Sequence, residues 1–322
     1  MLTFTQAEPI RLPFSLGTPE EAAAFVRRAD LSFDRRLEAA AAAIAEDCTA
    51  HGVRLIRLSG PTCAGKTTTA RKLTEVLEAA GRVVYPISLD DFFYDRAVLH
   101  ARAASRADGE LDYDSVETLD LDTLAASVRD LLATGSADIP VFDFVTGNRM
   151  GMRRLTVPDG VEPVFLFEGI QAVYPAVAAL FEGVPSRSVF INVERETTLV
   201  GPDGEERVFS PARIRLLRRL VRDEAKRGAT PDFTLTLWRS VRANEKTSIL
   251  PNAPACDYGI DSNMAFDIHM LAPHLRRIFR EHPCDGAEVA VAEALLRSLE
   301  GVEGISDDTI SENSLYHEFI LK

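Results

Sequence analysis

The sequence predicts an α/β fold built on a doubly wound parallel sheet flanked by helices. Short apolar runs at residues 53–58 and 83–89 enclose a helical segment at 66–80, and this alternation is typical of βαβ units. Another apolar run, at 164–167, shows no polar alternation, as expected for a parallel strand covered by helices on both faces. In such folds the carboxyl edge of the sheet carries the ligand site.

The overall composition is that of a globular protein and argues against several partners. The chain has 322 residues, of which 46% are hydrophobic and 26% are charged, so it can bury a sizeable core. Its formal net charge of −13 argues against a nucleic acid polymer or an anionic membrane as partner, because both attract basic surfaces. No signal segment and no apolar stretch of ~18 residues is present. The four cysteines are too widely spaced for a disulfide framework or a zinc site, and we expect reduced thiols in a cytoplasmic protein.

Three segments are expected along the chain. Residues 1–50 are rich in Ala and in charged residues and predict an N-terminal helical extension. Residues 51–282 would form the main domain, and residues 283–322 a C-terminal helix followed by a partly mobile acidic tail. A further strand is expected at 189–193, and further helices at 119–132, 213–227, 233–244, 271–280 and 287–299.

The clearest motif is a phosphate-binding loop between the first strand and the first helix of the main domain. Gly60 to Thr67 fit GxxxxGK[ST], the pattern of a P-loop NTPase-type fold. Backbone N–H groups of such a loop point at a phosphate, while Lys66 neutralises charge and Thr67 reaches a magnesium ion. The predicted ATP-phosphate ligands are Gly60, Thr62, Cys63, Ala64, Gly65, Lys66, Thr67 and Thr68. The alternative is a chance glycine-rich turn, and Arg54 and Arg57 are unusual in a strand that should be buried.

Two groups of carboxylates follow strands of the predicted sheet. Asp90 and Asp91 come directly after the run at 83–89, and Glu168 follows the run at 164–167. Both groups would project from the carboxyl edge of the sheet. There one carboxylate could accept a proton from an attacking hydroxyl while another holds magnesium. The alternative for the Asp pair is an N-cap or a turn.

The predicted helix at 213–227 is strongly basic. Five cations recur along one of its faces, at Arg215, Arg218, Arg219, Arg222 and Lys226. In an acidic protein this concentration favours an anionic ligand, because guanidinium groups bind phosphate oxygens through forked hydrogen bonds. The alternative is a solvated amphipathic helix.

Five motifs, in one order along the chain, together resemble the uridine kinase/phosphoribulokinase superfamily. They are residues 60–67 (GPTCAGKT), 88–93 (SLDDFF), Asp143-Phe144 with Arg149, 167–170 (FEGI) and 215–228 (RLLRRLVRDEAKRG). The likeness spans residues 53–257. A weaker likeness to a bacterial uridine kinase-like subgroup includes Glu318-Phe319 near the carboxyl end.

The resemblance implies a kinase that uses ATP and Mg²⁺, and it implies roles for individual residues. Asp90 would be the catalytic base, and Lys66 and Arg222 would support the transfer. The neighbours of magnesium would be Thr67, Asp90 and Glu168. The basic helix would be a mobile lid that carries Arg215, Arg218, Arg219, Arg222 and Arg227. The substrate contacts would be Asp114, Phe142, Phe144, Arg149 and Arg219.

The expected reaction is ATP-dependent phosphoryl transfer to the hydroxyl of a small-molecule substrate, foremost the 5′-hydroxyl of a nucleoside such as uridine or cytidine. Two departures leave the acceptor open, because Phe142 stands where the family has Tyr and Gly147 where it has His. Both family residues hydrogen-bond the base, so a kinase of another small alcohol, such as a sugar phosphate or a vitamin precursor, is a second candidate. A non-catalytic nucleotide-binding protein or a hydrolysing NTPase is a third. A homo-oligomer is left open.

Overall fold

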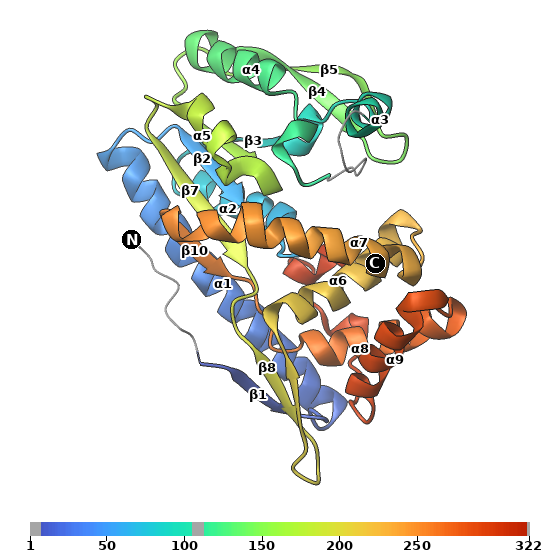
Figure 1. Ribbon diagram of the computed structural model, residues 1–322. Helices are drawn as coiled ribbons and strands as arrows, with labels where there is room; N and C mark the ends of the chain where they lie inside the picture. Colours follow the sequence, from blue (N-terminus) through green and yellow to red (C-terminus); the bar gives the residue numbers. More distant parts are fainter. Residues whose placement is uncertain (1–7, 105–112, 321–322) are drawn as a thin grey trace.

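The central sheet has five parallel strands in the order β10-β7-β2-β6-β3. Figure 1 shows this sheet in the computed structural model, which describes residues 8–104 and 113–320. The strands are β2 (Leu55–Ser59), β3 (Val83–Ser88), β6 (Pro163–Glu168), β7 (Ser186–Asn192) and β10 (Tyr258–Asp261). The expected doubly wound parallel sheet is confirmed, with β2 in the middle and β6 and β3 to one side of it.

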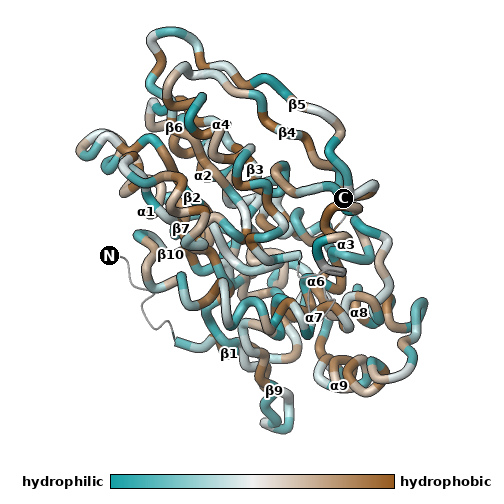
Figure 2. The backbone as a smooth tube through the Cα atoms, turned by 45° about the horizontal axis from the view of Figure 1, so that its top comes forward, coloured by the Kyte–Doolittle hydropathy of each residue, from teal (hydrophilic) through white to brown (hydrophobic). Residues whose placement is uncertain are grey.

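Helices cover both faces of the sheet, as its apolar strands require. They are α1 (Pro19–Ala50), α2 (Lys66–Ala79), α3 (Arg96–Ala104), α4 (Leu121–Thr134), α5 (Pro175–Ala178), α6 (Pro211–Arg227), α7 (Pro231–Asn244), α8 (Asp267–Glu281) and α9 (Val289–Leu299). Alternate strand residues face opposite ways: Leu55 and Phe165 pack in a cluster with α4, whereas Ile56 and Leu166 pack in the cluster of α1 and α2. Figure 2 shows hydrophobic colouring along much of these central strands. Across the described ranges, every helix lacks the combination of length and apolar composition that crossing a bilayer demands.

Arg57 is the charged residue within β2, and its side chain has partners of its own. It is half-buried, with its guanidinium 5.8 Å from the ring centroid of Phe181. Its Nη1 also donates to the carbonyl oxygen of Ala172 at 3.5 Å. An aromatic face and a carbonyl together offset part of the cost of burying the charge, so the central strand tolerates this arginine.

Two smaller sheets extend from this core. β4 (Ser136–Asp143) and β5 (Asn148–Thr156) form an antiparallel hairpin whose register shifts at Val141/Phe142. β1 (Ile10–Pro13), β8 (Thr197–Val200) and β9 (Glu206–Phe209) form the other sheet, in the order β1-β8-β9. The hairpin escapes prediction from sequence because β5 is mostly exposed and polar, so it lacks the apolar alternation that marks a half-buried strand.

Both terminal segments pack into the central core. In α1, Phe33 and Ile44 are buried in the same cluster as Leu315, Tyr316 and Phe319 from the carboxyl end. Residues 315–320 of the expected tail therefore pack into the core. Although the tail is acidic, its few large apolar side chains leave water by packing beside α1 and α2.

Candidate functional site

The phosphate-binding loop connects β2 to α2 at the carboxyl edge of the sheet, as its motif predicts. A Cβ on Gly60 would lie 2.0 Å from the carbonyl oxygen of Ile191 in the neighbouring strand β7. Gly65 has a φ of +94°, in the left-handed region. A side chain at position 60 would clash with β7, and a side chain at position 65 would strain the backbone. The two glycines therefore allow the loop to lie directly against the sheet.

The first turn of α2 presents groups that suit a phosphate. The Lys66 ammonium donates to the carbonyl oxygen of Pro61 at 3.0 Å, and Thr67 is exposed. The backbone N–H of Thr68 donates to the carboxylate of Glu318 at 3.1 Å. The N-terminus of a helix attracts negative charge, and here the anion at this end of α2 is the carboxylate of Glu318.

Asp90 and Glu168 lie at the ends of the adjacent strands β3 and β6. Ser88 is the residue of β3 that pairs with Glu168. The Ser88 hydroxyl donates to Glu168 Oε1 at 3.0 Å and accepts from the backbone N–H of Asp90 at 3.3 Å. Ser88, rather than an aspartate, therefore caps the turn that follows β3, and the N-cap alternative for the Asp pair does not hold.

Burial and mutual repulsion shift the pKa values of these carboxylates. Burial and then the neighbouring Asp90 raise the pKa of Glu168 to about 7, although Lys66 opposes the shift. Burial also raises the pKa of Asp90, against the opposing charges of Lys66, Arg227 and Arg222. Perturbed carboxylates beside cations are typical of catalytic sites.

Asp91 has a different role from its neighbour Asp90. Its carboxylate accepts a hydrogen bond from the backbone N–H of Phe142 at 3.2 Å and lies 3.9 Å from the guanidinium of Arg153. Burial raises the pKa of Asp91, and both contacts oppose that effect. Asp91 thus holds the β4–β5 hairpin in place beside the end of β3.

A cavity of about 540 Å³ opens beside Asp90. We call it the acceptor-side cavity; its lining includes the predicted site residues Thr62, Asp90, Asp114, Phe142, Phe144, Arg219 and Arg227. Its volume falls within the range of small-molecule sites, ~300–1,000 Å³. The fold therefore brings most of the predicted substrate residues together around the candidate base.

Three phenylalanines form one wall of this cavity. The ring centroid of Phe142 lies 5.6 Å from that of Phe93 and 5.3 Å from that of Phe144, both in edge-to-face geometry. Phe144 is 53% exposed, so part of this wall is open to a ligand. Aromatic rings in this arrangement suit a planar or apolar part of a ligand.

Arg96 contributes a cation to the same cavity and packs against Gly147. A Cβ on Gly147 would lie 2.5 Å from Arg96 Nε, and Gly147 has a φ of +70°. A histidine at this position, which the family resemblance would lead one to expect, would displace the arginine. The cavity therefore has a guanidinium where the family resemblance leads one to expect an imidazole.

Arg149, expected at the substrate, instead supports the segment that follows Asp90. Its Nε and Nη2 donate to the carbonyl oxygens of Phe93 and Phe92 at 2.9 and 3.0 Å. Its Nη1 donates to Asp120, the N-cap residue of α4, at 3.0 Å. With all three nitrogens engaged in the protein, Arg149 is a positioning residue.

Asp223 forms ion pairs with three of the predicted lid arginines. Its carboxylate lies 2.7 Å from Arg222 and 3.1 Å from Arg219. Arg227 is farther away, at 3.7 Å. Arg219 and Arg227 also line the acceptor-side cavity. Asp223 therefore holds a cluster of cations, two of which line this cavity.

Arg215 and Arg218, in contrast, are buried behind the phosphate-binding loop. Arg215 forms an ion pair with Glu245 and donates to the carbonyl oxygen of Thr62 at 3.2 Å. Arg218 is paired with Asp267 at 2.7 Å and donates to the carbonyl oxygen of Cys63 at 3.3 Å. The expectation that they belong to the lid is wrong for these two arginines, because carboxylates from other elements fix them in the core.

A second hollow, of about 370 Å³, lies on the other side of the carboxylates. Thr67 and Glu168 line it together with Ser88. Two of the predicted magnesium neighbours therefore share one hollow, while Asp90 lines the acceptor-side cavity. The two carboxylates thus line different hollows at the carboxyl edge of the sheet.

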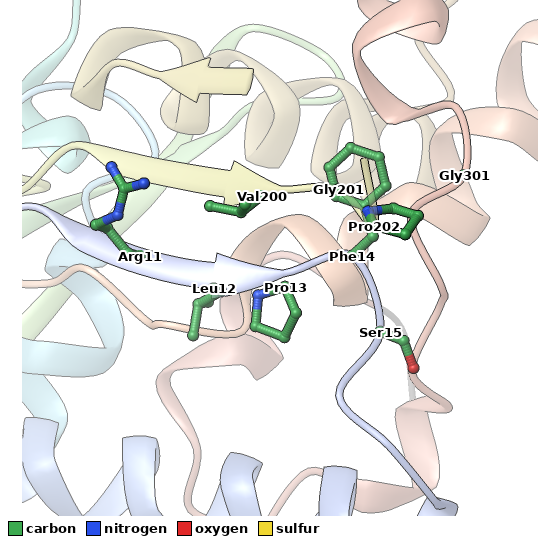
Figure 3. A pocket seen from close by; sticks show the side chains of 9 residues that line it. All are labelled: Arg11, Leu12, Pro13, Phe14, Ser15, Val200, Gly201, Pro202 and Gly301. Atoms are coloured by element: carbon green, nitrogen blue, oxygen red, sulfur yellow. The ribbon is translucent and has the colours of Figure 1, made fainter. Parts of the chain in front are cut away.

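Another hollow, of about 600 Å³, lies between β1 and residues 200–202 (Figure 3). Its lining is largely apolar and includes Leu12, Pro13 and Phe14. The one charged side chain shown there, that of Arg11, is paired with Glu206. This hollow lacks a set of reactive side chains among its lining residues, and we place the functional site at the loop.

Some residues of the site carry only a weak signal in the sequence. Asp223 directly follows Arg222 within the basic motif, and Ser88 precedes Asp90 by two residues, so motif context could have indicated both. Arg96 has no such local signal, and the weaker likeness that includes Glu318-Phe319 does not place Glu318 at the loop. Glu318 is separated by 250 residues from its partner Thr68, and only the packing of the chain brings them together.

Comparisons with known proteins show what this chain resembles. Residues 55–196 match the model of the Phosphoribulokinase / Uridine kinase family. The uridine kinase of Chlamydia pneumoniae is 28% identical over 212 residues, which cover 65% of this chain and 82% of the relative. Uridine-cytidine kinase 2-B of Danio rerio is 28% identical over 242 residues, which cover 71% of this chain and 82% of the relative. The solved phosphoribulokinase from Rhodobacter spheroides aligns with 64% of this chain and 68% of its own, at 17% identity and a TM-score of 0.44. The chain is thus similar to members of the phosphoribulokinase/uridine kinase superfamily of P-loop kinases.

Proposed function

We propose that this protein uses ATP and Mg²⁺ to phosphorylate a hydroxyl of a small molecule, foremost the 5′-hydroxyl of a nucleoside such as uridine or cytidine. The observation that carries this proposal is the position of Asp90. Its carboxylate lines the acceptor-side cavity and is also within electrostatic range of Lys66 in the phosphate-binding loop. A base between a phosphate site and an acceptor site is what in-line phosphoryl transfer needs.

The donors at the carboxyl edge fit a magnesium nucleotide. Thr67, Asp90 and Glu168 would offer the hydroxyl and carboxylate oxygens that Mg²⁺ prefers. The raised pKa of Glu168 reflects burial and repulsion from Asp90, which a divalent cation would offset. When bound, Mg·ATP would supply the phosphoryl group, and its ion would neutralise charge on the phosphates.

In this reaction one site residue would accept a proton, and the cations would stabilise negative charge on the phosphates. Asp90 would accept the proton of the acceptor hydroxyl, and a raised pKa makes its carboxylate a better base. The Lys66 ammonium, which donates to the carbonyl oxygen of Pro61 here, would bind phosphate oxygens instead. Arg222 and Arg227 would stabilise the charge that develops during transfer.

Two features favour a nucleoside as acceptor. The wall formed by Phe93, Phe142 and Phe144 offers aromatic faces and edges to a planar base. Asp114 lines the same cavity, and a carboxylate there could accept hydrogen bonds from ribose hydroxyls. This assignment of Asp114 rests on the family resemblance together with its position.

One observation favours a second candidate, a sugar phosphate. Arg96 places a guanidinium in the acceptor-side cavity, and His100 lines the cavity as well. Guanidinium groups bind phosphate through charge-assisted hydrogen bonds. An acceptor that already carries a phosphate would use this charge, whereas an uncharged nucleoside would not.

A panel of acceptors tests the proposal directly. ADP release by the purified full chain would be measured with Mg·ATP alone and with uridine, cytidine, purine nucleosides, pentose phosphates or pantothenate. We expect release to depend on a pyrimidine nucleoside. Dependence on a pentose phosphate would favour the second candidate. Equal release with and without every acceptor would indicate an NTPase, and nucleotide binding with no release would indicate a binding protein.

A further inference from the structure

We propose that Glu318 is an internal anion that occupies the phosphate-binding end of α2 in the nucleotide-free protein, so that a nucleotide binds by displacing it. The inference rests on the proposed function in one respect only, namely that nucleotide phosphates bind at this loop. It does not depend on which acceptor is phosphorylated or on whether transfer occurs.

The contact joins a carboxylate to a group that is central to phosphate binding. Glu318 accepts the backbone N–H of Thr68 at 3.1 Å, and Thr68 is the third residue of α2 (Lys66–Ala79). The first N–H groups of a helix have no partner within the helix and carry its positive dipole end. Glu318 also contributes, after burial and Asp90, to the raised pKa of Glu168. The carboxylate therefore lies within range of the proposed magnesium site.

The segment that carries Glu318 is fixed in the core. Leu315 is buried and packs so closely on the loop that a Cβ on Gly65 would lie 2.5 Å from Leu315 Cδ1. Tyr316 is also buried, and its hydroxyl donates to Asp267 at 2.8 Å. Withdrawing the segment would expose these side chains to water, which is unfavourable. Displacement of the anion is therefore a rotation of one side chain, with the backbone staying in place.

The same segment is tied to the basic helix and, through it, to the loop. The ammonium of Lys226 in α6 donates to the carbonyl oxygen of His317, the residue before Glu318. Arg218 of α6 shares the carboxylate of Asp267 with Tyr316. These contacts hold Glu318 at the loop for as long as α6 keeps its place.

Competition between Glu318 and a nucleotide follows from charge and space. One N–H group cannot donate a full hydrogen bond to a carboxylate and to a phosphate at the same time, and two anions at one helix end repel each other. An anion at a helix N-terminus contributes enough that its loss would change affinity for a competing anion by roughly 2- to 30-fold. Glu318 thus lowers the affinity for nucleotide and keeps the loop satisfied when no nucleotide is present.

The test compares Glu318→Gln with Glu312→Gln in the full chain. Glutamine at 318 keeps the size and a hydrogen-bond acceptor but removes the charge, whereas Glu312 is an exposed carboxylate in the same tail. Binding of ADP and of tripolyphosphate, both without Mg²⁺, would be measured by isothermal titration calorimetry. We expect E318Q to bind both ligands roughly 2- to 30-fold more tightly than wild type, and E312Q to bind them as wild type does.

Thermal unfolding provides a second readout that a purely structural role would not produce. Without ligand, E318Q should melt below wild type, because the loop loses its anion. With saturating ADP, E318Q should show the larger rise in Tm. Unchanged or weaker binding of either ligand by E318Q would overturn the proposal, as would an equal gain in E312Q, which would indicate a general effect of net charge. Acceptor-dependent ADP release is measured separately, so failure of the proposed reaction would leave this binding result intact.

Discussion

Asp223 Oδ1 accepts two hydrogen bonds from Arg222, at 3.0 Å from Nε and 2.7 Å from Nη2. The other carboxylate oxygen lies 3.1 Å from Nε of Arg219. Burial alone would raise the pKa of Asp223, but Arg222, Arg219 and Arg227 lower it below its usual range. The cations proposed to act on the phosphates are therefore held in place by one buried carboxylate.

Replacing Asp223 with Asn should destabilise the protein and lower its activity. The arginines around it would lose their counter-charge in a buried setting, a change that costs about 3 kcal/mol of unfolding free energy. Urea denaturation would measure this loss. Glu224→Gln is the matched control, because the adjacent Glu224 pairs with the half-exposed Arg277, and such pairs contribute about 1 kcal/mol or less. Equal stability of D223N and wild type would contradict the assigned role.

Glu168 should make the nucleotide-free protein less stable as the pH rises from 4.5 to about 7. Its pKa is raised from 4.5 to about 7 in the folded chain, so in this window the folded state keeps a proton that the unfolded state has lost. The folded state then binds more protons, and the free energy of unfolding falls with rising pH. For a single group the fall reaches at most about 3 kcal/mol.

Glu168→Gln removes this titration, so the variant should show a flatter dependence of unfolding free energy on pH across the same window. Denaturation curves at pH 4.5, 5.5, 6.5 and 7.5 would compare the two proteins. Parallel curves for wild type and E168Q would show that Glu168 is ionised in the folded chain across the window.

Asp90→Asn should separate nucleotide binding from phosphoryl transfer. Loss of a general base lowers the transfer rate by ~10²–10⁴-fold, while ADP binding should persist, because the loop amides and Lys66 are unchanged. Steady-state kinetics and calorimetry would measure the two quantities. Asp91→Asn is the comparison: because Asp91 holds the Phe142 backbone, we expect its main effect on KM for the acceptor. Near-normal turnover in D90N would contradict the assignment of Asp90 as the general base.

Arg149→Ala should behave as a structural variant. It removes hydrogen bonds to the carbonyl oxygens of Phe92 and Phe93 and an ion pair with Asp120. Hydrogen bonds to charged groups contribute about 1.5–3 kcal/mol each, so we expect the free energy of unfolding to fall by at least about 2 kcal/mol. Lysine cannot reproduce this forked geometry, so R149K should not restore stability. A rise in the KM for the acceptor, with no loss of stability, would instead indicate that Arg149 contacts the substrate.

Arg96→Gln distinguishes the two candidate acceptors. If the acceptor carries a phosphate, loss of the guanidinium removes charge-assisted hydrogen bonds and should raise KM by roughly 10- to 100-fold. If the acceptor is an uncharged nucleoside, KM should change by less than about threefold. The measurement is a kinetic comparison of R96Q and wild type with the acceptor that the panel identifies. Arg102→Gln on the same helix, α3, serves as the control.

Much of the fold follows from local patterns that survive in the structure. The expected strand at 83–89 is β3 (Val83–Ser88), and the expected helix at 66–80 is α2 (Lys66–Ala79). The helix expected at 119–132 is α4 (Leu121–Thr134), which ends where Gly135 adopts the left-handed conformation as its C-cap. The β4–β5 hairpin could not be predicted in this way, because β5 is mostly exposed and polar and lacks the apolar alternation of a half-buried strand.

The sequence by itself determined the phosphate-binding loop and the placement of Asp90 and Glu168 at one sheet edge, since a loop motif is local and parallel strands all end on the same side. Only the tertiary structure decided which arginines of α6 face the cavity and which are buried, and that Glu318 rests on α2. Helical periodicity defines the faces of a helix, but which face is covered, and by which carboxylate, depends on elements that are distant in the chain.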